Sequence, residues 1–517
     1  MPVDPPTIEE LRDIAGSFGL RLTDTDLASF QGLMAPLLES YRVVEGLDES
    51  APLAPKYSRT PGWRPTPEEN PLNAWYWRCD IRGAADGPLA GKTVAVKDNV
   101  CVAGVPMMNG SAVLEGYVPD VDATIVTRVL DAGGTIAGKA VCEDLCCSGG
   151  SFTAFTGPVL NPCDPTRQAG GSSSGSAALV GSGAVDLAIG GDQGGSIRIP
   201  SSWSGIVGLK PTYGLVPYSG VAPLELTVDH AGPMGRTVAD VALFLEVLAG
   251  RDGLDPRQPS EVPTERYSQA LSGDLAGMRV GLVEEGFGWE GLSEPEVDEA
   301  VRDAAHRLEK AGAAVSTVSV PLHRAGIHIF FTVVIEGATA LLMQGNGLGS
   351  NWKGWYPTSL LDGYARGLRA RADDLSETIK LVALLGEYVH RHYGGRHYAK
   401  GQNLVHSLRQ AYERPGGYVF LEVPNFASSA AARLGMDWDG AQPADHFMQY
   451  TPEGLSRLLN RAELVAVQLL PTTRRIYESG TSWRRERNAA LIAHQDWPPL
   501  DLLRGVARAP HAADGGQ

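Results

Sequence analysis

The chain has 517 residues, of which 43% are hydrophobic and 20% are charged, so it is long and apolar enough to fold around large buried cores. Its 44 basic and 60 acidic residues give a formal net charge of −16, which argues against DNA or an anionic membrane surface as the main partner. The six cysteines all lie between Cys79 and Cys163 without a C-x-x-C pair, so we expect neither a disulfide scaffold nor a zinc site.

The amino-terminal residues Met1 to Pro6 contain neither a basic run nor an apolar run, so they do not resemble a signal peptide. The most apolar stretch, Ile327 to Met343, is interrupted by Thr332, Glu336 and Thr339. It falls short of the roughly 20 apolar residues that a membrane-spanning helix needs. We therefore expect a cytoplasmic protein that binds neither a membrane nor a nucleic acid.

Two helices are predicted in the first 50 residues. Thr7 and Glu10 have the spacing of a capping box, and a second helix is expected from about Thr25. Two amphipathic helices cannot bury their apolar faces alone, so this piece must pack on the main body or on a second subunit. Six prolines between Pro52 and Pro71 predict a linker. We therefore expect a helical extension with its linker over residues 1–65 and a main domain over residues 66–517.

Beyond about residue 88, predicted strands alternate with predicted helices. In chain order we expect strand 93–97, helix 123–132, strand 135–137, helix 174–183, strand 185–189, a helix that Thr237 caps and that ends near Ala249, strand 278–283, helix 294–311 and strand 314–320. This alternation predicts an α/β fold in which helices cover both faces of a central mixed β-sheet. Residues 325–450 are expected to be mostly helical.

Glycine and serine are concentrated between Ala169 and Pro200. Two glycine-flanked serine sites, Gly170 to Ser176 and Gly194 to Ser196, are separated by a predicted helix and a predicted strand. An isolated Gly/Ser run is typical of a flexible linker, but here ordered structure follows directly and a second cluster comes within one α-β unit. Glycines lack a Cβ atom, so backbone N–H groups in such turns can converge on a bound oxygen.

Two other chemical motifs fit poorly. Gly171 to Gly175 matches G-x-S-x-G, but that nucleophile turn needs a strand directly before it, and a proline-punctuated loop precedes it here. Gly87 to Thr93 resembles a phosphate-binding loop but is one residue short and leads into a strand instead of a helix.

Lys97 ends the predicted strand 93–97, where an ordinary lysine would simply face solvent. Together, however, Ala95-Val96-Lys97-Asp98-Asn99, Gly138-Lys139 and the whole segment Gly170 to Ser201 resemble the amidase signature family of serine hydrolases. The resemblance is strong over roughly residues 70–255 and looser elsewhere. It implies the amidase signature fold for the main domain.

Within that family, the chain is similar to bacterial amidases of nitrile metabolism. The similarity is carried by Val105-Pro106-Met107-Met108-Asn109-Gly110-Ser111, by Gly190-Gly191-Asp192-Gln193 and by the helical extension. It implies that the extension makes dimer contacts.

The resemblance assigns three catalytic roles. Ser196 is the expected nucleophile, Ser172 the bridging serine and Lys97 the base. A serine hydroxyl is a poor nucleophile until a neighbour takes its proton, and lysine can do so only as the neutral amine. A hydroxyl between the two can pass the proton inward and later return it to the departing amine.

The resemblance further implies a cis peptide bond between Gly171 and Ser172. The backbone N–H groups of Gln193, Gly194, Gly195 and Ser196 are the expected oxyanion hole. Around these groups, Asp192 and Arg198 are expected to pair and hold the loop, with an ordinary surface ion pair as the alternative. Ser173 and Gly171 are expected to support the same turn.

The substrate pocket is expected at Cys147, Gly149, Gly150 and Gln193, roofed by residues 325–450. The resemblance implies an amidase that hydrolyses carboxamide C–N bonds through an acyl-enzyme, with no metal and no cofactor. Aryl and alkyl amides lead, with anilides, esters and carbamates (urethanes) as chemical neighbours. The alternatives are the catalytic subunit of a tRNA-dependent amidotransferase, which needs a partner chain, and a binding protein without activity.

Overall fold

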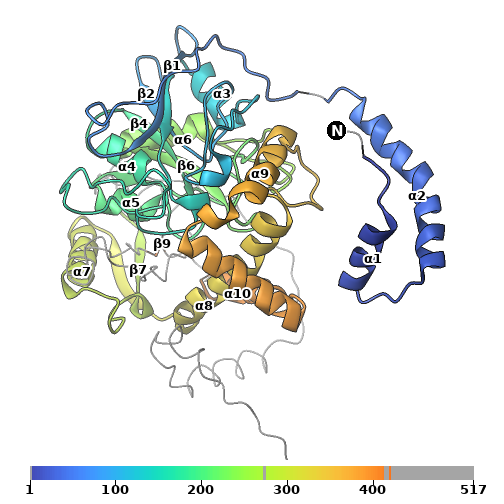
Figure 1. Cartoon of the computed structure of the whole chain (residues 1–517). Coiled ribbons are helices and arrows are strands. Elements are labelled where there is room, and N and C mark those ends of the chain that lie inside the picture. The colour runs from blue at the N-terminus through green and yellow to red at the C-terminus, as the bar shows by residue number, and fades with distance from the viewer. Residues whose placement is uncertain (1–2, 50, 272–274, 413–418, 421–517) are drawn as a thin grey trace, which may run out of the picture. The chain divides into compact units, whose positions relative to one another are not determined.

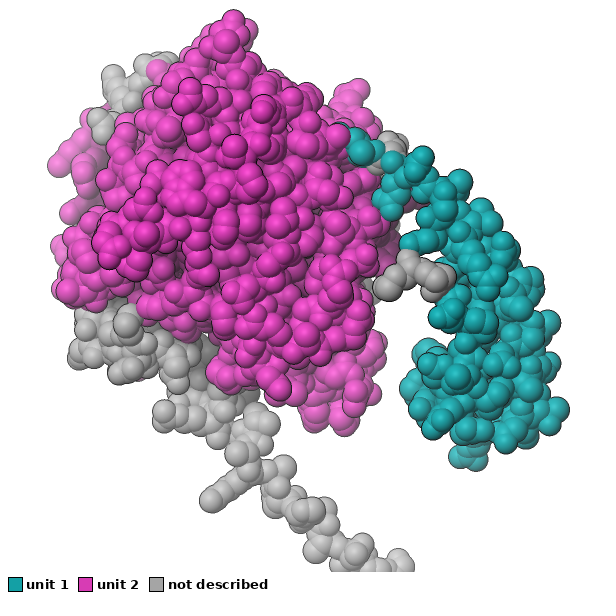
Figure 2. Space-filling view, turned by 45° about the horizontal axis from the view of Figure 1, so that its top comes forward, with its two compact units in different colours: residues 1–52 teal, residues 53–517 magenta. Residues whose placement is uncertain are grey.

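The computed structural model describes residues 3–49, 51–271, 275–412 and 419–420, which belong to two structural units (Figure 2). The first unit is Met1–Pro52 and the second is Leu53–Gln517. The proline-rich segment belongs to the second unit, where Arg59 pairs with buried Asp122 at 2.6 Å. The structure therefore divides the chain at residue 52, earlier than the boundary at 65 that the sequence suggested.

The first unit contains two helices, α1 (Ile8–Ser17) and α2 (Asp24–Glu45). The predicted capping box of Thr7 and Glu10 is confirmed, and Thr23 caps α2 in the same way. The core of this unit is small, with Leu11, Ala15 and Leu27 as its buried members.

The second unit is built on a six-stranded sheet with the order β1-β3-β2-β4-β6-β5 (Figure 1). The central strand β2 pairs in parallel with β3 and β4, whereas β1, β6 and β5 join antiparallel. The strands are β1 (Trp75–Arg82), β2 (Thr93–Lys97), β3 (Thr135–Ala140), β4 (Leu187–Asp192), β5 (Val207–Gly208) and β6 (His230–Gly235). The predicted mixed sheet is thus confirmed, and β1, β5 and β6 are strands that the sequence analysis missed.

Helices cover both faces of this sheet. On one face, α3 (Thr124–Asp131) and α6 (Val238–Leu248) pack on side chains such as Val94 and Ile136. On the other face, α4 (Ser174–Gly181) packs on the small side chains Ala95 and Ala188, with α5 (Arg198–Trp203) beside it. Parallel strands buried on both faces read as continuous apolar runs, which is why β2 was predictable.

The later β-α-β unit forms a separate sheet. Strands β7 (Arg279–Val283), β8 (Ala314–Val318) and β9 (Val419–Phe420) pair in parallel in the order β8-β7-β9, and α7 (Pro295–Lys310) connects the first two. The sequence predicted these elements but not their separation from the central sheet, because strand patterns carry no information about which sheet a strand joins.

The segment predicted as a helical cap is helical as far as the structure describes it. It contains α8 (Gly326–Ala338), a π-helical turn η6 (Thr339–Gln344), α9 (Thr358–Arg371), α10 (Glu377–Tyr393) and α11 (Arg396–Tyr412). Residues 413–418 and 421–450 of this segment lie outside the described residues. Short 3-10 turns complete the description: η1 (Ala112–Leu114), η2 (Asp144–Cys146), η3 (Tyr267–Ala270), η4 (Glu284–Gly286), η5 (Pro321–Ala325) and η7 (Ala372–Asp374).

The run Pro321–Gln344 is long and apolar enough to cross a membrane, which the sequence argument from interrupting polar residues had denied. Of its most apolar window, 56% is buried inside the protein, and α8 packs against α10 and α11. A core helix of a soluble protein passes the same length test, so this run is weak evidence for a membrane span.

Candidate active site

The carboxyl ends of β2 and β4 place the predicted reacting groups at one edge of the sheet. Lys97 is the last residue of β2, Ser172 lies just before α4, and Ser196 follows β4 in the turn before α5. The two strands are parallel neighbours, so the loops that leave their carboxyl ends meet at the same edge.

Lys97 and Ser172 are in direct contact. The Nζ of Lys97 donates a hydrogen bond to Ser172 Oγ at 2.8 Å and another to the carbonyl of Gly191 at 3.1 Å. Both side chains are fully buried, which excludes a surface lysine. The peptide bond between Gly171 and Ser172 is cis, as the resemblance implied.

The turns that carry Ser172 and Ser196 touch through their backbones. The N–H of Ser173 donates to the carbonyl of Ser196 at 3.1 Å, and the hydroxyl of Ser173 donates to the Gly191 carbonyl at 3.0 Å. No described residue makes a hydrogen bond with the hydroxyl of Ser196, which lies in a side chain 7% exposed. The structure thus joins Lys97 to Ser172 directly, and Ser196 to them through the neighbouring backbone.

Asp192 and Arg198 form a buried ion pair at 2.9 Å. The carboxylate of Asp192 also accepts the N–H groups of Gly195 and Ile197. Burial raises the pKa of Asp192, but the charge and hydrogen bonds of Arg198 outweigh burial and hold that pKa well below its ordinary value. The predicted pair is therefore present, and it is interior instead of exposed on the surface.

This carboxylate corrects one part of the expected oxyanion hole. The N–H of Gly195 donates to Asp192 at 2.8 Å, so it is not free for a substrate oxygen. The N–H groups of Gln193, Gly194 and Ser196 have no acceptor among the described residues. The loop therefore offers three unpaired donors where the sequence analysis expected four.

Phe330 of α8 lies directly over the oxyanion loop. A Cβ atom on Gly194 would stand 2.5 Å from its ring, so only glycine fits there. Phe330 packs in an apolar cluster with Cys147 and Leu224. The cap helix α8 thereby brings an aromatic wall to the loop that carries Ser196.

The other residues of the expected substrate pocket lie against the Ser172 turn. The carbonyl of Gly149 accepts the N–H of Gly171 at 2.8 Å, and a Cβ on Gly171 would stand 2.4 Å from the carbonyl oxygen of Gly150. The structure therefore packs Gly149 and Gly150 behind this turn.

A buried ion pair that the sequence analysis did not assign supports the end of β2. Lys139 of β3 lies 2.9 Å from Asp98, whose other carboxylate oxygen accepts the N–H groups of Met108 and Asn109. Burial raises the pKa of the Asp98 carboxyl, and the charge of Lys139 limits the rise. The available signal was two opposite charges on adjacent apolar strands, since such charges are buried only when paired.

A second polar group was also missed. The side-chain amide of Gln193 donates to Asp229 at 2.7 Å and to the Tyr218 hydroxyl at 3.2 Å, and Asn99 donates to the same hydroxyl at 3.4 Å. Burial raises the pKa of the Asp229 carboxyl to about 7, and the charge of Arg257 limits the rise. No local motif marks these residues, because three different loops contribute them.

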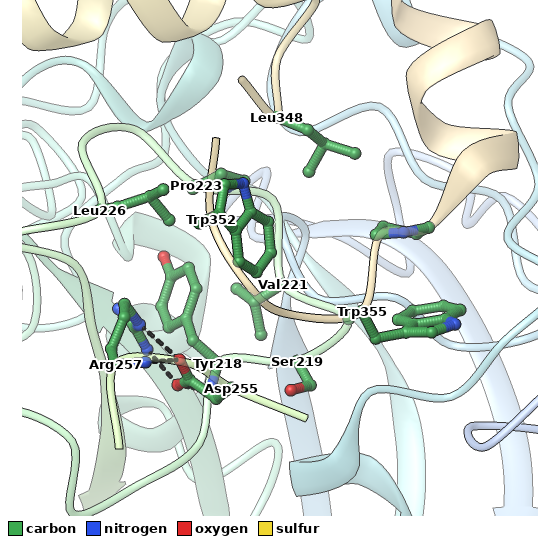
Figure 3. Close-up of a pocket in the computed structure, with 12 residues that line it drawn as sticks. Tyr218, Ser219, Val221, Pro223, Leu226, Asp255, Arg257, Leu348, Trp352 and Trp355 are labelled. Atoms are coloured by element: carbon green, nitrogen blue, oxygen red, sulfur yellow. Dashed lines mark hydrogen bonds and ion pairs between the residues drawn. The ribbon is translucent and has the colours of Figure 1, made fainter. Parts of the chain in front are cut away.

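The ring of Tyr218 also lines a pocket with an empty volume of about 330 Å³ (Figure 3). Trp352 and Trp355 stand in this pocket, and at one end Arg257 and Asp255 form an ion pair at 2.7 Å. None of the residues expected in the substrate pocket (Cys147, Gly149, Gly150, Gln193) lines it. It is therefore separate from the predicted acyl pocket, although its wall bonds to Gln193.

Metal-binding side chains are not grouped in the part of the chain that the structure describes: no three His, Cys, Asp or Glu residues there are placed to hold an ion.

Comparison with known proteins agrees with this geometry. Residues 67–432 match the family model described as Amidase, which spans more than half of the chain. The chain belongs to the amidase family. It is a hydrolase that acts on amides, and its α/β core is the amidase signature fold.

Three similar proteins illustrate the range of this amidase family. An enantioselective amidase of Rhodococcus rhodochrous is 46% identical, with 79% of this chain and 78% of that protein aligned. A glutamyl-tRNA(Gln) amidotransferase subunit from a Synechococcus strain is 35% identical over 74% and 77%. The structure of the peptide amidase PAM with the competitive inhibitor chymostatin superposes with a TM-score of 0.52 at 29% identity, over 62% and 66%.

Proposed function

We propose that this amidase hydrolyses aryl or alkyl carboxamides by transferring the acyl group to Ser196 and then to water. Anilides, esters and carbamates are accepted by the same acylation chemistry. The observation that carries the proposal is the buried 2.8 Å contact between Lys97 and Ser172 beside the Ser196 turn.

In the first step, Ser196 Oγ bonds to the carbonyl carbon. Its proton passes to Ser172, and the proton of Ser172 passes to the neutral amine of Lys97. The negative charge that develops on the carbonyl oxygen is stabilised by the free N–H groups of Gln193, Gly194 and Ser196. Support for this relay comes from the Ser173–Ser196 backbone bond, which keeps the two serine turns together.

In the second step, the C–N bond breaks and the proton on Lys97 returns through Ser172 to the departing nitrogen. An amide needs this proton because an amide anion is a very poor leaving group. Water then attacks the acyl-enzyme by the same relay. The pair of Asp192 and Arg198 supports the proposal by fixing the loop that carries Ser196.

The substrate's acyl group is proposed to be apolar. Phe330 over Gly194, together with Cys147 and Leu224, presents a hydrophobic wall next to the free N–H donors. A panel of aromatic amides, aliphatic amides, anilides and carbamates tests this proposal. Hydrolysis should persist in a chelator and be lost with a serine-directed phosphonate.

A second candidate is the catalytic subunit of a tRNA-dependent amidotransferase, favoured by the 35% identical relative of that kind. The two functions separate cleanly in a purified preparation. A stand-alone amidase hydrolyses a simple aromatic amide by itself, whereas an amidotransferase subunit co-purifies with a partner chain and depends on it.

We further propose that the first unit joins two copies of the chain. The side chains of Phe30, Leu33, Leu37, Tyr41 and Val44 are 46–67% exposed and recur at helical spacing along α2. One apolar stripe of this kind needs a covering partner. The six unpaired cysteines support a reducing, cytoplasmic setting, with a small-molecule amide as substrate.

A further inference from the structure

The thiol of Cys146 lies against the Lys97–Ser172 pair, and the proposed relay gives it no role. Its sulfur is within hydrogen-bonding contact of both side chains and of Cys142. Burial alone would raise the pKa of this thiol, but the hydrogen bond with Cys142 and the charge of Lys97 lower it to about 7. By contrast, burial raises the pKa of Cys147, the next residue, to about 12.

Asn109 anchors this thiol. Its side-chain oxygen accepts the thiol of Cys146 at 3.3 Å and that of Cys142 at 3.5 Å. The backbone N–H of Asn109 in turn donates to Asp98, the residue that follows Lys97. The thiol and the amine are thus held by a closed ring of contacts that begins and ends at the carboxyl end of β2.

The backbone supports a deliberate placement of this side chain. Asn109, Leu145 and Cys146 have φ angles of 51°, 47° and 63°, which non-glycine residues rarely adopt. The N–H of Leu145 donates to the carbonyl of Asn109 at 3.0 Å, so the three residues form one connected turn. Left-handed residues of this kind cluster at functional sites and persist only where their surroundings enforce them.

We propose that Cys146 is a positioning residue for Lys97 that also holds the proton Lys97 must lose before it can act as a base. The proposal rests on the proposed function of Lys97. The thiol donates to Asn109 and leaves its sulfur lone pairs for an N–H of Lys97, which turns the nitrogen lone pair towards Ser172.

The pair exchanges one proton. In the ammonium–thiolate form, a proton moves from Lys97 Nζ to Cys146 Sγ, so that one N–H bond breaks, one S–H bond forms and the amine becomes free. Both forms have zero net charge, and no proton has to leave for solvent from a fully buried site. A dry environment disfavours separated charges, so burial favours the reactive amine–thiol form.

Other titratable groups surround this pair. Tyr218 senses the charge on Cys146, and burial raises the pKa of its hydroxyl. Burial likewise raises the pKa of the Glu143 and Asp144 carboxyls, which precede Cys146 in the chain. The groups that face the thiol or its neighbours are Lys97, Cys142, Tyr218, Glu143, Asp144 and the Asp98–Lys139 pair.

The first test compares pH profiles of amide hydrolysis for the wild type, Cys146→Ala and Cys146→Ser, with Cys101→Ser as a buried-cysteine control. With the thiol present, the first proton leaves the pair near pH 7; without it, Lys97 must lose its own proton. Both variants should therefore shift the acidic limb of kcat upwards by about one pH unit or more, a roughly tenfold loss at neutral pH. KM should change little, and Cys146→Ser should recover more of the alkaline kcat than Cys146→Ala.

The second test does not depend on hydrolysis. Thiolate ultraviolet absorbance is titrated in Ser196→Ala protein, with and without the additional changes Cys146→Ser or Lys97→Met. A thiol that titrates near pH 7 should disappear with Cys146→Ser and move to higher pH with Lys97→Met. An unchanged titration after Lys97→Met, or wild-type pH profiles in both Cys146 variants, would overturn the proposal. Loss of hydrolysis alone would bear on the proposed function instead.

Discussion

The amine of Lys97 donates a 2.8 Å hydrogen bond to the hydroxyl of Ser172, although 75 positions separate the two residues in the chain. This contact exists because β2 ends at the sheet edge where α4 begins. It turns a lysine and a serine, each unremarkable in the sequence, into a buried acid–base pair.

Removing the amine should abolish most of the activity. Lys97→Met keeps the length of the side chain but cannot accept a proton, so kcat/KM for an aromatic amide should fall by roughly 10²–10⁴. The loss should be at least as large for the amide as for the matching ester, because the amide also needs its leaving group protonated. Steady-state kinetics on the two substrates measure this ratio, and an amide less affected than the ester would contradict the relay.

Breaking the buried pair of Asp192 and Arg198 should destabilise the protein. Arg198→Ala leaves the Asp192 carboxylate buried without its charge partner, which should lower the free energy of unfolding by about 3–5 kcal/mol. Denaturant titration measures the change. Arg82→Ala, which breaks the exposed Arg82–Asp80 pair, is the control and should have no measurable effect. Equal effects of the two changes would mean that the interior pair does not hold the loop.

Asp229 should make stability depend on pH. Burial raises its pKa from 3.8 to about 7, so the folded protein binds this proton more tightly than the unfolded chain does. The stability contributed by that proton is fully present below about pH 4 and is lost as the pH rises towards 7. Asp229→Asn removes this dependence, so the difference in Tm between the variant and the wild type should grow in the variant's favour from pH 5 to pH 8. A pH-independent difference would refute the assignment.

The apolar stripe of α2 should control the oligomeric state. Leu33→Asp with Leu37→Asp places two charges on the exposed stripe without touching the buried Leu27. Light scattering coupled to size-exclusion chromatography should show a dimer for the wild type and a monomer for the variant. A monomeric wild type, or a dimer that survives both charges, would contradict a self-association role for this face.

Much of the fold was predictable because local patterns coincide with tertiary burial. The apolar run of β2, the capping box at Thr7 and the cap at Thr237 are each set by residues close in the chain, and all three occur in the structure. Strand β6 was missed because its sequence, HAGPMG, contains two glycines and a proline, residues that are depleted in strands. Its strand conformation comes from pairing with β4.

The site was predictable only as far as its motif extends. The contact of Lys97 with Ser172 agrees with the resemblance, and the roles of both residues and of Ser196 stay predictions. The motif could not show that Asp192 uses the N–H of Gly195, nor that Gln193 is held by Asp229 and Tyr218. These interactions join separate loops, and no spacing in the sequence encodes the distance between them.

The most direct measurement is the site of covalent modification by a serine-directed fluorophosphonate, mapped by mass spectrometry of the digested protein. A single adduct on the peptide that contains Ser196 is expected, together with loss of amide hydrolysis. The Ser196→Ala variant should stay folded, remain unmodified and be inactive. An adduct on another residue, or continued hydrolysis by the folded Ser196→Ala variant, would show that Ser196 is not the nucleophile.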